Sequence, residues 1–98
     1  MVRTINVNEI TKNIKEMCIE ANHYLSPDMD KAMKQAEQTE KSPLGKQILG
    51  QLQENLKIAA EDMIPICQDT GMAVIFLEIG QDVHFEGGLL EDAVNEGV

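Results

Sequence analysis

Two apolar parts of the sequence are joined by the polar stretch Pro65-Ile66-Cys67-Gln68-Asp69-Thr70-Gly71. Proline lacks the N–H that continues a helix and biases the residue before it to an extended backbone, so Pro65 is expected to end a helix. Glycine at position 71 allows a sharp turn before the next element. A thiol, an amide, a carboxylate and a hydroxyl thus stand together on a predicted loop between buried elements, which is a common place for binding residues.

Before this loop, the apolar residues recur at steps of three and four, which indicates amphipathic helices. Asn6 or Asn8 is a candidate cap for the first helix. Ser26 and Ser42, each followed by proline, are expected to start the next two, because serine caps a helix and proline suits its first position. The predicted helices cover residues 10–25, 27–41 and 44–63. Residues 1–63 are therefore predicted to be helical.

After the loop, the pattern changes to that of strands. Residues 72–79 are almost all apolar and include β-branched side chains, which indicates a strand covered on both faces. Alternation at residues 83–85 predicts a second strand that pairs back as a hairpin. A glycine pair then breaks the chain, and a short helix follows that is expected to end at a Gly97 cap.

These patterns together predict an α+β fold class. A helical N-terminal half is followed, within residues 64–98, by a β-hairpin or strand pair and a short helix. A sheet of two strands leaves unpaired edges and needs further partners for stability. We therefore expect residues 1–98 to be a single domain or fragment that belongs to a larger sheet-containing subunit.

Composition limits the class of protein further. The apolar fraction of 43% suits a globular core, and 98 residues suffice for one small domain. The net charge of −9 argues against binding to nucleic acid. The sequence lacks both a signal-peptide pattern and an apolar run approaching the roughly 20 residues of a membrane span. Two cysteines in an acidic chain form no disulfide framework. We expect a cytoplasmic protein with neither nucleic-acid nor membrane partners.

Three hypotheses for Cys67 remain open from the spacing of the residues. A nucleophilic cysteine needs a neighbouring base, and neither histidine is near it in the sequence. A metal or iron–sulfur ligand needs further thiolates, whereas Cys18, the other cysteine, lies on an apolar helical stripe. The third hypothesis is a buried structural cysteine at a turn, with Asp69 and Thr70 bonded to the local backbone.

The loop and the apolar run after it resemble the N-terminal part of the iron–sulfur hydro-lyases of the class I fumarase and L-tartrate dehydratase family. The resemblance is to the first part of the α subunit, or to the equivalent segment of single-chain forms. It extends over nearly the whole chain in short motifs. These are Ala21-Asn22, residues 40–45, Glu54-Asn55, Ile58-Ala59, residues 79–83, Gly87-Gly88, residues 90–93 and Gly97-Val98.

Membership in such a family implies a cofactor and roles for three residues. These enzymes hold a [4Fe–4S] cluster on three cysteines and catalyse reversible dehydration of a 2-hydroxy dicarboxylic acid, either malate to fumarate or tartrate to oxaloacetate. Cys67 matches the first cluster ligand. Gln68 and Asp69 match substrate-binding residues, with Gln68 as a hydrogen-bonding group and Asp69 also as the catalytic proton-transfer residue. Two further cluster cysteines are missing, so the isolated 98 residues are expected to be inactive.

The resemblance also implies partners. These are the dicarboxylate substrate, the rest of the α subunit, and a β subunit or C-terminal domain, in a homo-oligomer. The alternative function is a non-catalytic helical interaction module, whose apolar stripes bury against another protein.

Overall fold

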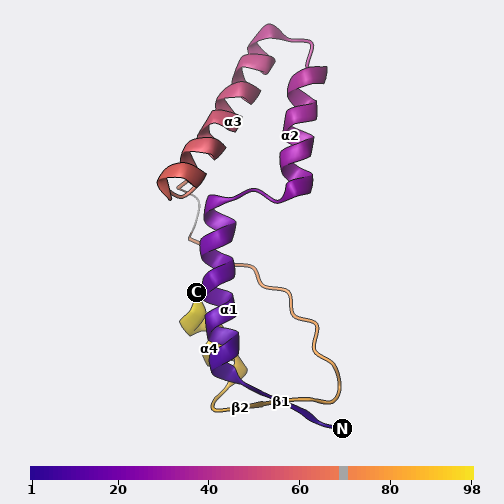
Figure 1. The fold of residues 1–98 in the computed structure, drawn as a ribbon, viewed down its shortest axis with the longest axis vertical. Coiled ribbons are helices and arrows are strands. Elements are labelled where there is room, and N and C mark those ends of the chain that lie inside the picture. Colours follow the sequence, from indigo (N-terminus) through magenta and orange to yellow (C-terminus); the bar gives the residue numbers. More distant parts are fainter. Residues whose placement is uncertain (69–70) are drawn as a thin grey trace. The chain divides into compact units, whose positions relative to one another are not determined.

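The computed structural model describes residues 1–68 and 71–98, which fall into two compact units. Unit 1 comprises Met1–Ile19 and Gly71–Val98, and unit 2 comprises Glu20–Thr70. The elements follow one another as labelled in Figure 1. They are β1 (Arg3–Asn6), α1 (Val7–His23), α2 (Pro27–Thr39), α3 (Pro43–Asp62), β2 (Val83–Glu86) and α4 (Leu90–Gly97). The predicted α+β fold class is confirmed.

Unit 1 contains a small parallel sheet that the sequence did not reveal. Strand β1 pairs with β2 so that Arg3 lies opposite Val83 and Asn6 lies opposite Glu86. The backbone N–H of Arg3 also donates to the carbonyl of Asp82 at 2.8 Å. The predicted hairpin is therefore wrong, because β2 pairs with the N-terminal residues and not with the run that precedes it. Of the two predicted strands only the second forms, and its partner Arg3–Asn6 lies in the part of the chain that was predicted to be helical.

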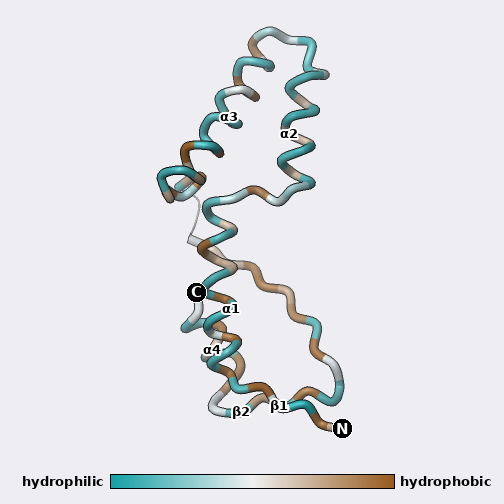
Figure 2. Tube along the Cα trace, in the orientation of Figure 1, coloured by the Kyte–Doolittle hydropathy of each residue, from teal (hydrophilic) through white to brown (hydrophobic). Residues whose placement is uncertain are grey.

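Residues 72–79 do not form the strand that their composition predicted. Most of their apolar side chains are exposed, with Phe76 at 92% and Met72 at 84%. Figure 2 shows this segment, which leads into β2, as mostly hydrophobic. A strand needs a neighbour for its backbone N–H and C=O groups, and β2 is paired with β1. Among residues 1–68 and 71–98, no strand pairs with this run, so it stays irregular.

Helices α1 and α4 pack together in unit 1. Val7 and Ile14 of α1 are buried, as is Ala93 of α4. The hydroxyl of Thr11 donates to the carbonyl of Ala93 at 2.9 Å. Gly97 is buried inside α4 and is not its cap, which corrects the prediction, since Val98 follows as the cap residue. The position of Gly97 is explained by its close approach to α1.

Unit 2 is built around the helix pair α2 and α3, which lie side by side in Figure 1. The hydroxyl of Ser42 accepts a hydrogen bond from the N–H of Gly45 at 3.2 Å, so the predicted cap of α3 is confirmed. Ser26 precedes α2 but makes no such cap bond with its side chain. Its hydroxyl instead hydrogen-bonds the Asp28 carboxyl, and this bond is the main cause that lowers the pKa of Asp28. Asn6 caps α1, because its side-chain oxygen accepts from the N–H of Asn8 at 2.9 Å.

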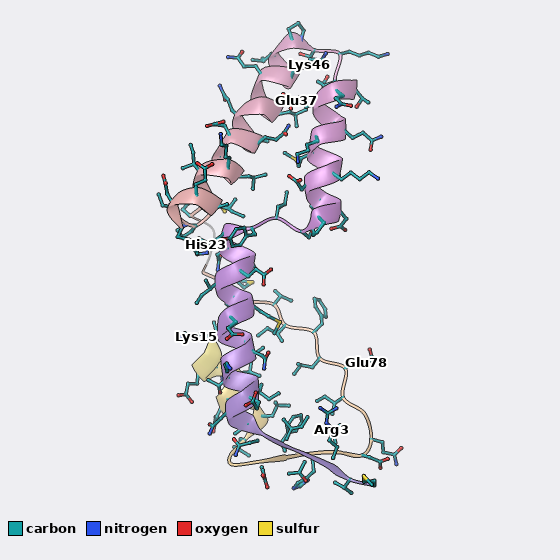
Figure 3. All side chains as sticks on the ribbon, in the orientation of Figure 1. Arg3, Lys15, His23, Glu37, Lys46 and Glu78 are labelled. Carbon is teal, nitrogen blue, oxygen red and sulfur yellow. The ribbon has the colours of Figure 1, made fainter. Side chains whose placement is uncertain are left out.

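The two helices of this pair are linked by polar side chains as well. The Gln53 amide of α3 donates to the carboxylate of Glu37 on α2, and Figure 3 labels Glu37 beside α3. A methyl group added at Gly50 would lie 3.3 Å from the same carboxylate. Gly50 of α3 therefore lies close to the Glu37 side chain of α2. No helix in the described part of the chain has the length and apolar character needed to cross a membrane.

Replacing Gly97 by alanine tests the contact between α1 and α4. An added Cβ would lie 2.7 Å from both the Cβ of Ile14 and the backbone carbonyl oxygen of Thr11, so one of the helices must shift. Helix propensity alone would make alanine stabilising by up to about 1 kcal/mol. We expect instead a loss of about 1–3 kcal/mol in the free energy of unfolding, measured by urea denaturation.

The matched control is Gly80→Ala, in the turn before β2. Its Cβ would meet only Val83, at an ordinary contact distance of 3.8 Å. We expect a change within about 0.5 kcal/mol. If Gly97→Ala is as stable as the control variant, the tight packing of α4 against α1 is not present in solution.

Candidate functional site

The chain approaches Cys67 through a left-handed turn at the end of α3. Met63 has φ 51° and ψ 48°, a conformation in which helices commonly end and which glycine usually occupies. The N–H groups of Met63 and Ile64 both donate to the carbonyl of Ala59, the second at 3.2 Å. The helix is thus closed at Asp62, before Pro65 is reached. The chain is turned back toward the helix that it has just left.

The residue before Cys67 is held by both of its backbone polar groups. The N–H of Ile66 donates to the carbonyl of Asn22, near the end of α1, at 2.7 Å. The carbonyl of Ile66 accepts from the side-chain amide of Asn55, in the third quarter of α3, at 2.8 Å. Both partners lie in unit 2. The loop is therefore fixed to two helices immediately before the cysteine.

Cys67 and Gln68 follow this fixed residue in a bend, and both are exposed. The structure thus brings two of the three predicted site residues side by side on the surface of unit 2. The third, Asp69, lies outside the described residues, as does Thr70. The hypothesis of a buried structural cysteine at position 67 is wrong, because this thiol is exposed.

The other candidate residues lie elsewhere. Cys18 is half-buried on α1 and belongs to unit 1, whereas Cys67 belongs to unit 2. His84 is in β2 of unit 1, and His23 ends α1 in unit 2. Within residues 1–68 and 71–98, no group of three or more His, Cys, Asp or Glu side chains is placed to hold a metal ion. Cys67 is thus a single exposed donor on an anchored loop.

Unit 2 also contains a cavity of about 400 Å³. An ion pair stands at its wall, where the Lys34 ammonium lies 2.8 Å from the Asp30 carboxylate. His23, labelled in Figure 3, lines the cavity where α1 ends. The remaining lining residues are Tyr24, Leu25, Gln53, Leu56, Lys57 and Ala60. Cys67 and Gln68 do not line this cavity, so it is separate from the candidate site.

The anchoring role of Asn22 and Asn55 was not predicted, although both residues lie in the short motifs that carry the family resemblance. Asn55 lies inside a long helix, where asparagine is a poor helix former because its side chain competes for backbone hydrogen bonds. That mismatch was the available signal, because an asparagine inside a helix often bonds to something other than its own helix. The carbonyl of Asn22 gives no signal in the sequence, since every residue has one.

Comparison with known proteins identifies the family. A sequence model of the family described as fumarate hydratase (Fumerase) matches residues 11–98. A protein of Methanocaldococcus jannaschii (strain ATCC 43067 / DSM 2661 / JAL-1 / JCM 10045 / NBRC 100440), named "Putative L(+)-tartrate dehydratase subunit alpha", is 38% identical over 76 residues. These cover 78% of this chain and 27% of that protein, so the chain spans about a quarter of its relative. No solved structure matches.

This chain belongs to the fumarate hydratase family. The resemblance noted from the loop motif is thereby confirmed. The matched range includes the loop with Cys67 and the two residues that anchor it.

Alkylation tests the placement of the two cysteines. In metal-free native protein, iodoacetamide should modify the exposed Cys67 about tenfold faster than the half-buried Cys18, because reactivity requires access to the thiol. Peptide mass spectrometry at several reaction times measures both rates. In urea the two rates should converge. Equal rates in the native protein would mean that Cys67 is covered.

Proposed function

We propose that this chain is the N-terminal part of a [4Fe–4S] hydro-lyase that reversibly dehydrates a 2-hydroxy dicarboxylic acid, such as malate or tartrate. The supporting observation is the exposed Cys67 on an anchored loop, in a chain of the fumarate hydratase family. The name of the relative from M. jannaschii supports a tartrate-type substrate, and the description of the family supports a fumarate-type one.

The donor chemistry of Cys67 fits an iron–sulfur cluster. Thiolate is the soft ligand that such clusters require, and the Cys67 thiol is exposed where a metal can reach it. When bound, a cluster with one open iron supplies a Lewis acid that helps the substrate hydroxyl to depart. The described residues contain no second cysteine in unit 2, so the two other ligands would come from elsewhere in the protein.

Gln68 and Asp69 would handle the substrate beside this ligand. The exposed Gln68 amide has N–H donors that can bind a substrate carboxylate or hydroxyl oxygen. Asp69 would accept the proton from the carbon next to the one that carries the hydroxyl. Both come within two residues of Cys67 in the sequence, which limits how far they can lie from the cluster ligand.

The proposed partners follow from the size of the match. The relative is named as a subunit alpha, and this chain spans 27% of it. The rest of an α subunit, and a β subunit or C-terminal domain, would complete the site in a homo-oligomer of the cytoplasm. The exposed apolar side chains of residues 72–79 would then be covered by these partners.

The same exposed run favours the second candidate function, a non-catalytic interaction module. The two functions differ in the role of Cys67. A module that only binds another protein has no need for an exposed thiol, whereas the hydro-lyase loses its cofactor without it.

Replacing Cys67 by serine in the full-length protein tests the proposed function. Serine removes the soft ligand, so iron content and cluster absorption should fall to near zero and turnover of malate and tartrate should be lost. Cys18→Ala is the matched control, with cluster and turnover retained and a stability loss on the order of 1 kcal/mol. If Cys67→Ser keeps both cluster and activity, Cys67 is not the cluster ligand. If the wild-type full-length protein holds no cluster and turns over neither acid, the interaction module replaces the hydro-lyase.

Asp69→Asn separates proton transfer from cluster binding. Asparagine has nearly the same shape but no basic carboxylate, so the cluster should remain while turnover falls by about 10²- to 10⁴-fold. Iron content and turnover are measured on the same preparation. Full activity of this variant would remove Asp69 from the proposed proton transfer and leave the role of Cys67 standing.

A further inference from the structure

We propose that Asn55 is a positioning residue that sets the direction in which Cys67 presents its sulfur. This inference rests on the proposed function, in which Cys67 binds the cluster. Asn55 does not touch substrate or cluster. It acts through the carbonyl of Ile66, to which its side-chain amide donates at 2.8 Å.

The geometry of the peptide bond carries the effect to Cys67. The carbonyl of Ile66 lies in one rigid plane with the N and Cα atoms of Cys67. Holding that oxygen fixes the tilt of the plane, and the bond from the Ile66 N–H to the Asn22 carbonyl at 2.7 Å holds the preceding peptide. Only the φ and χ1 rotations of Cys67 then remain to aim its sulfur. Asn55 thus removes freedom from the backbone that carries the ligand.

The position of Asn55 on α3 agrees with this role. Asn55 and Ala59 are four residues apart, so they lie on the same face of the helix. The Asn55 side chain reaches Ile66 at 2.8 Å, so the returning chain lies on this face. Lys57 of α3 lines the cavity and lies two residues further on, which is about 200° around the helix. The anchored loop and the cavity therefore use different faces of α3.

Asparagine at this position is not explained by α3 itself. The residue is exposed, and alanine, lysine or glutamate would favour the helix more. Its hydrogen bond reaches a residue 11 positions later, beyond the end of the helix. Residues that orient a metal ligand without binding the metal typically contribute 10- to 100-fold to metal affinity. Asn55 is expected to act in the same way on cluster retention.

The test uses the full-length cluster-loaded enzyme and the variant Asn55→Asp. Aspartate keeps the size of asparagine but has no N–H to donate, so the bond to Ile66 is lost. We expect the cluster to be lost to an iron chelator roughly 10- to 100-fold faster under anaerobic conditions, with an unchanged midpoint of thermal unfolding. In metal-free protein, amide exchange at residues 66–68 should also be faster, which reports on the loop independently of the cluster.

Two further variants complete the experiment. Asn55→Ala removes the donor while favouring the helix, and it should lose the cluster as Asn55→Asp does, which covers the case that the aspartate variant fails to fold. Gln51→Ala, at an exposed position one turn earlier on α3, should behave as wild type. Wild-type cluster loss and amide exchange in both Asn55 variants, or equally fast loss in Gln51→Ala, would overturn the inference.

The outcome is distinct from a failure of the proposed function. If Cys67→Ser keeps the cluster, Cys67 is no ligand, and its part in the proposed function fails together with the role of Asn55. If Cys67→Ser loses the cluster while both Asn55 variants retain it at the wild-type rate, the proposed function stands and only the positioning role is wrong.

Discussion

The packing of α4 on α1 joins the two helices of unit 1, beside the pairing of β1 with β2. The Thr11 hydroxyl bonds to the carbonyl of Ala93, and Gly97 approaches Ile14 one turn further along both helices. The later residue of α1, Ile14, contacts the later residue of α4, Gly97, so the two helices run in the same direction. Each helix follows a strand by a few residues at most. Parallel helices that each follow a strand closely are compatible with the parallel pairing of β1 and β2 across a long stretch of sequence.

In unit 2 the equivalent constraint is the reversal of the chain after α3. A residue with a side chain in the left-handed conformation costs about 1 kcal/mol relative to glycine, and Met63 adopts it. The Met63 side chain makes a contact that a glycine could not make, because the Tyr24 hydroxyl donates to the Met63 sulfur at 3.5 Å. The reversal brings Ile66 between Asn22 and Asn55. The loop with Cys67 is thus held at its start by Asn22, near the end of α1, and by Asn55 of α3.

Local chemistry made part of this fold predictable. The Ser42 cap and the helices follow from signals within a few residues, and they were predicted correctly. Gly97 was wrongly predicted to be a cap. The reason for a glycine at this position is its close approach to α1, which depends on residues more than 80 positions away. Residues 72–79 have the composition of a strand, but no described strand pairs with them. For the site, the exposure of Cys67 follows from its polar neighbours, whereas its anchor depends on the Asn55 side chain reaching a backbone carbonyl 11 residues later.

The loop anchor is made only of neutral groups, which matters for the proposed chemistry. Between Met63 and Gly80 the sequence contains no Lys, Arg or His, whereas Asp69 and Glu78 are acidic. A thiolate and a carboxylate are both negative, so each would repel a substrate that carries two negative charges. This repulsion is stronger where water is excluded. An amide at position 55 fixes the loop without adding charge of either sign. In the proposed function, the positive groups that bind a dicarboxylate would therefore come from outside this loop, so that different residues would position the ligand and attract the substrate.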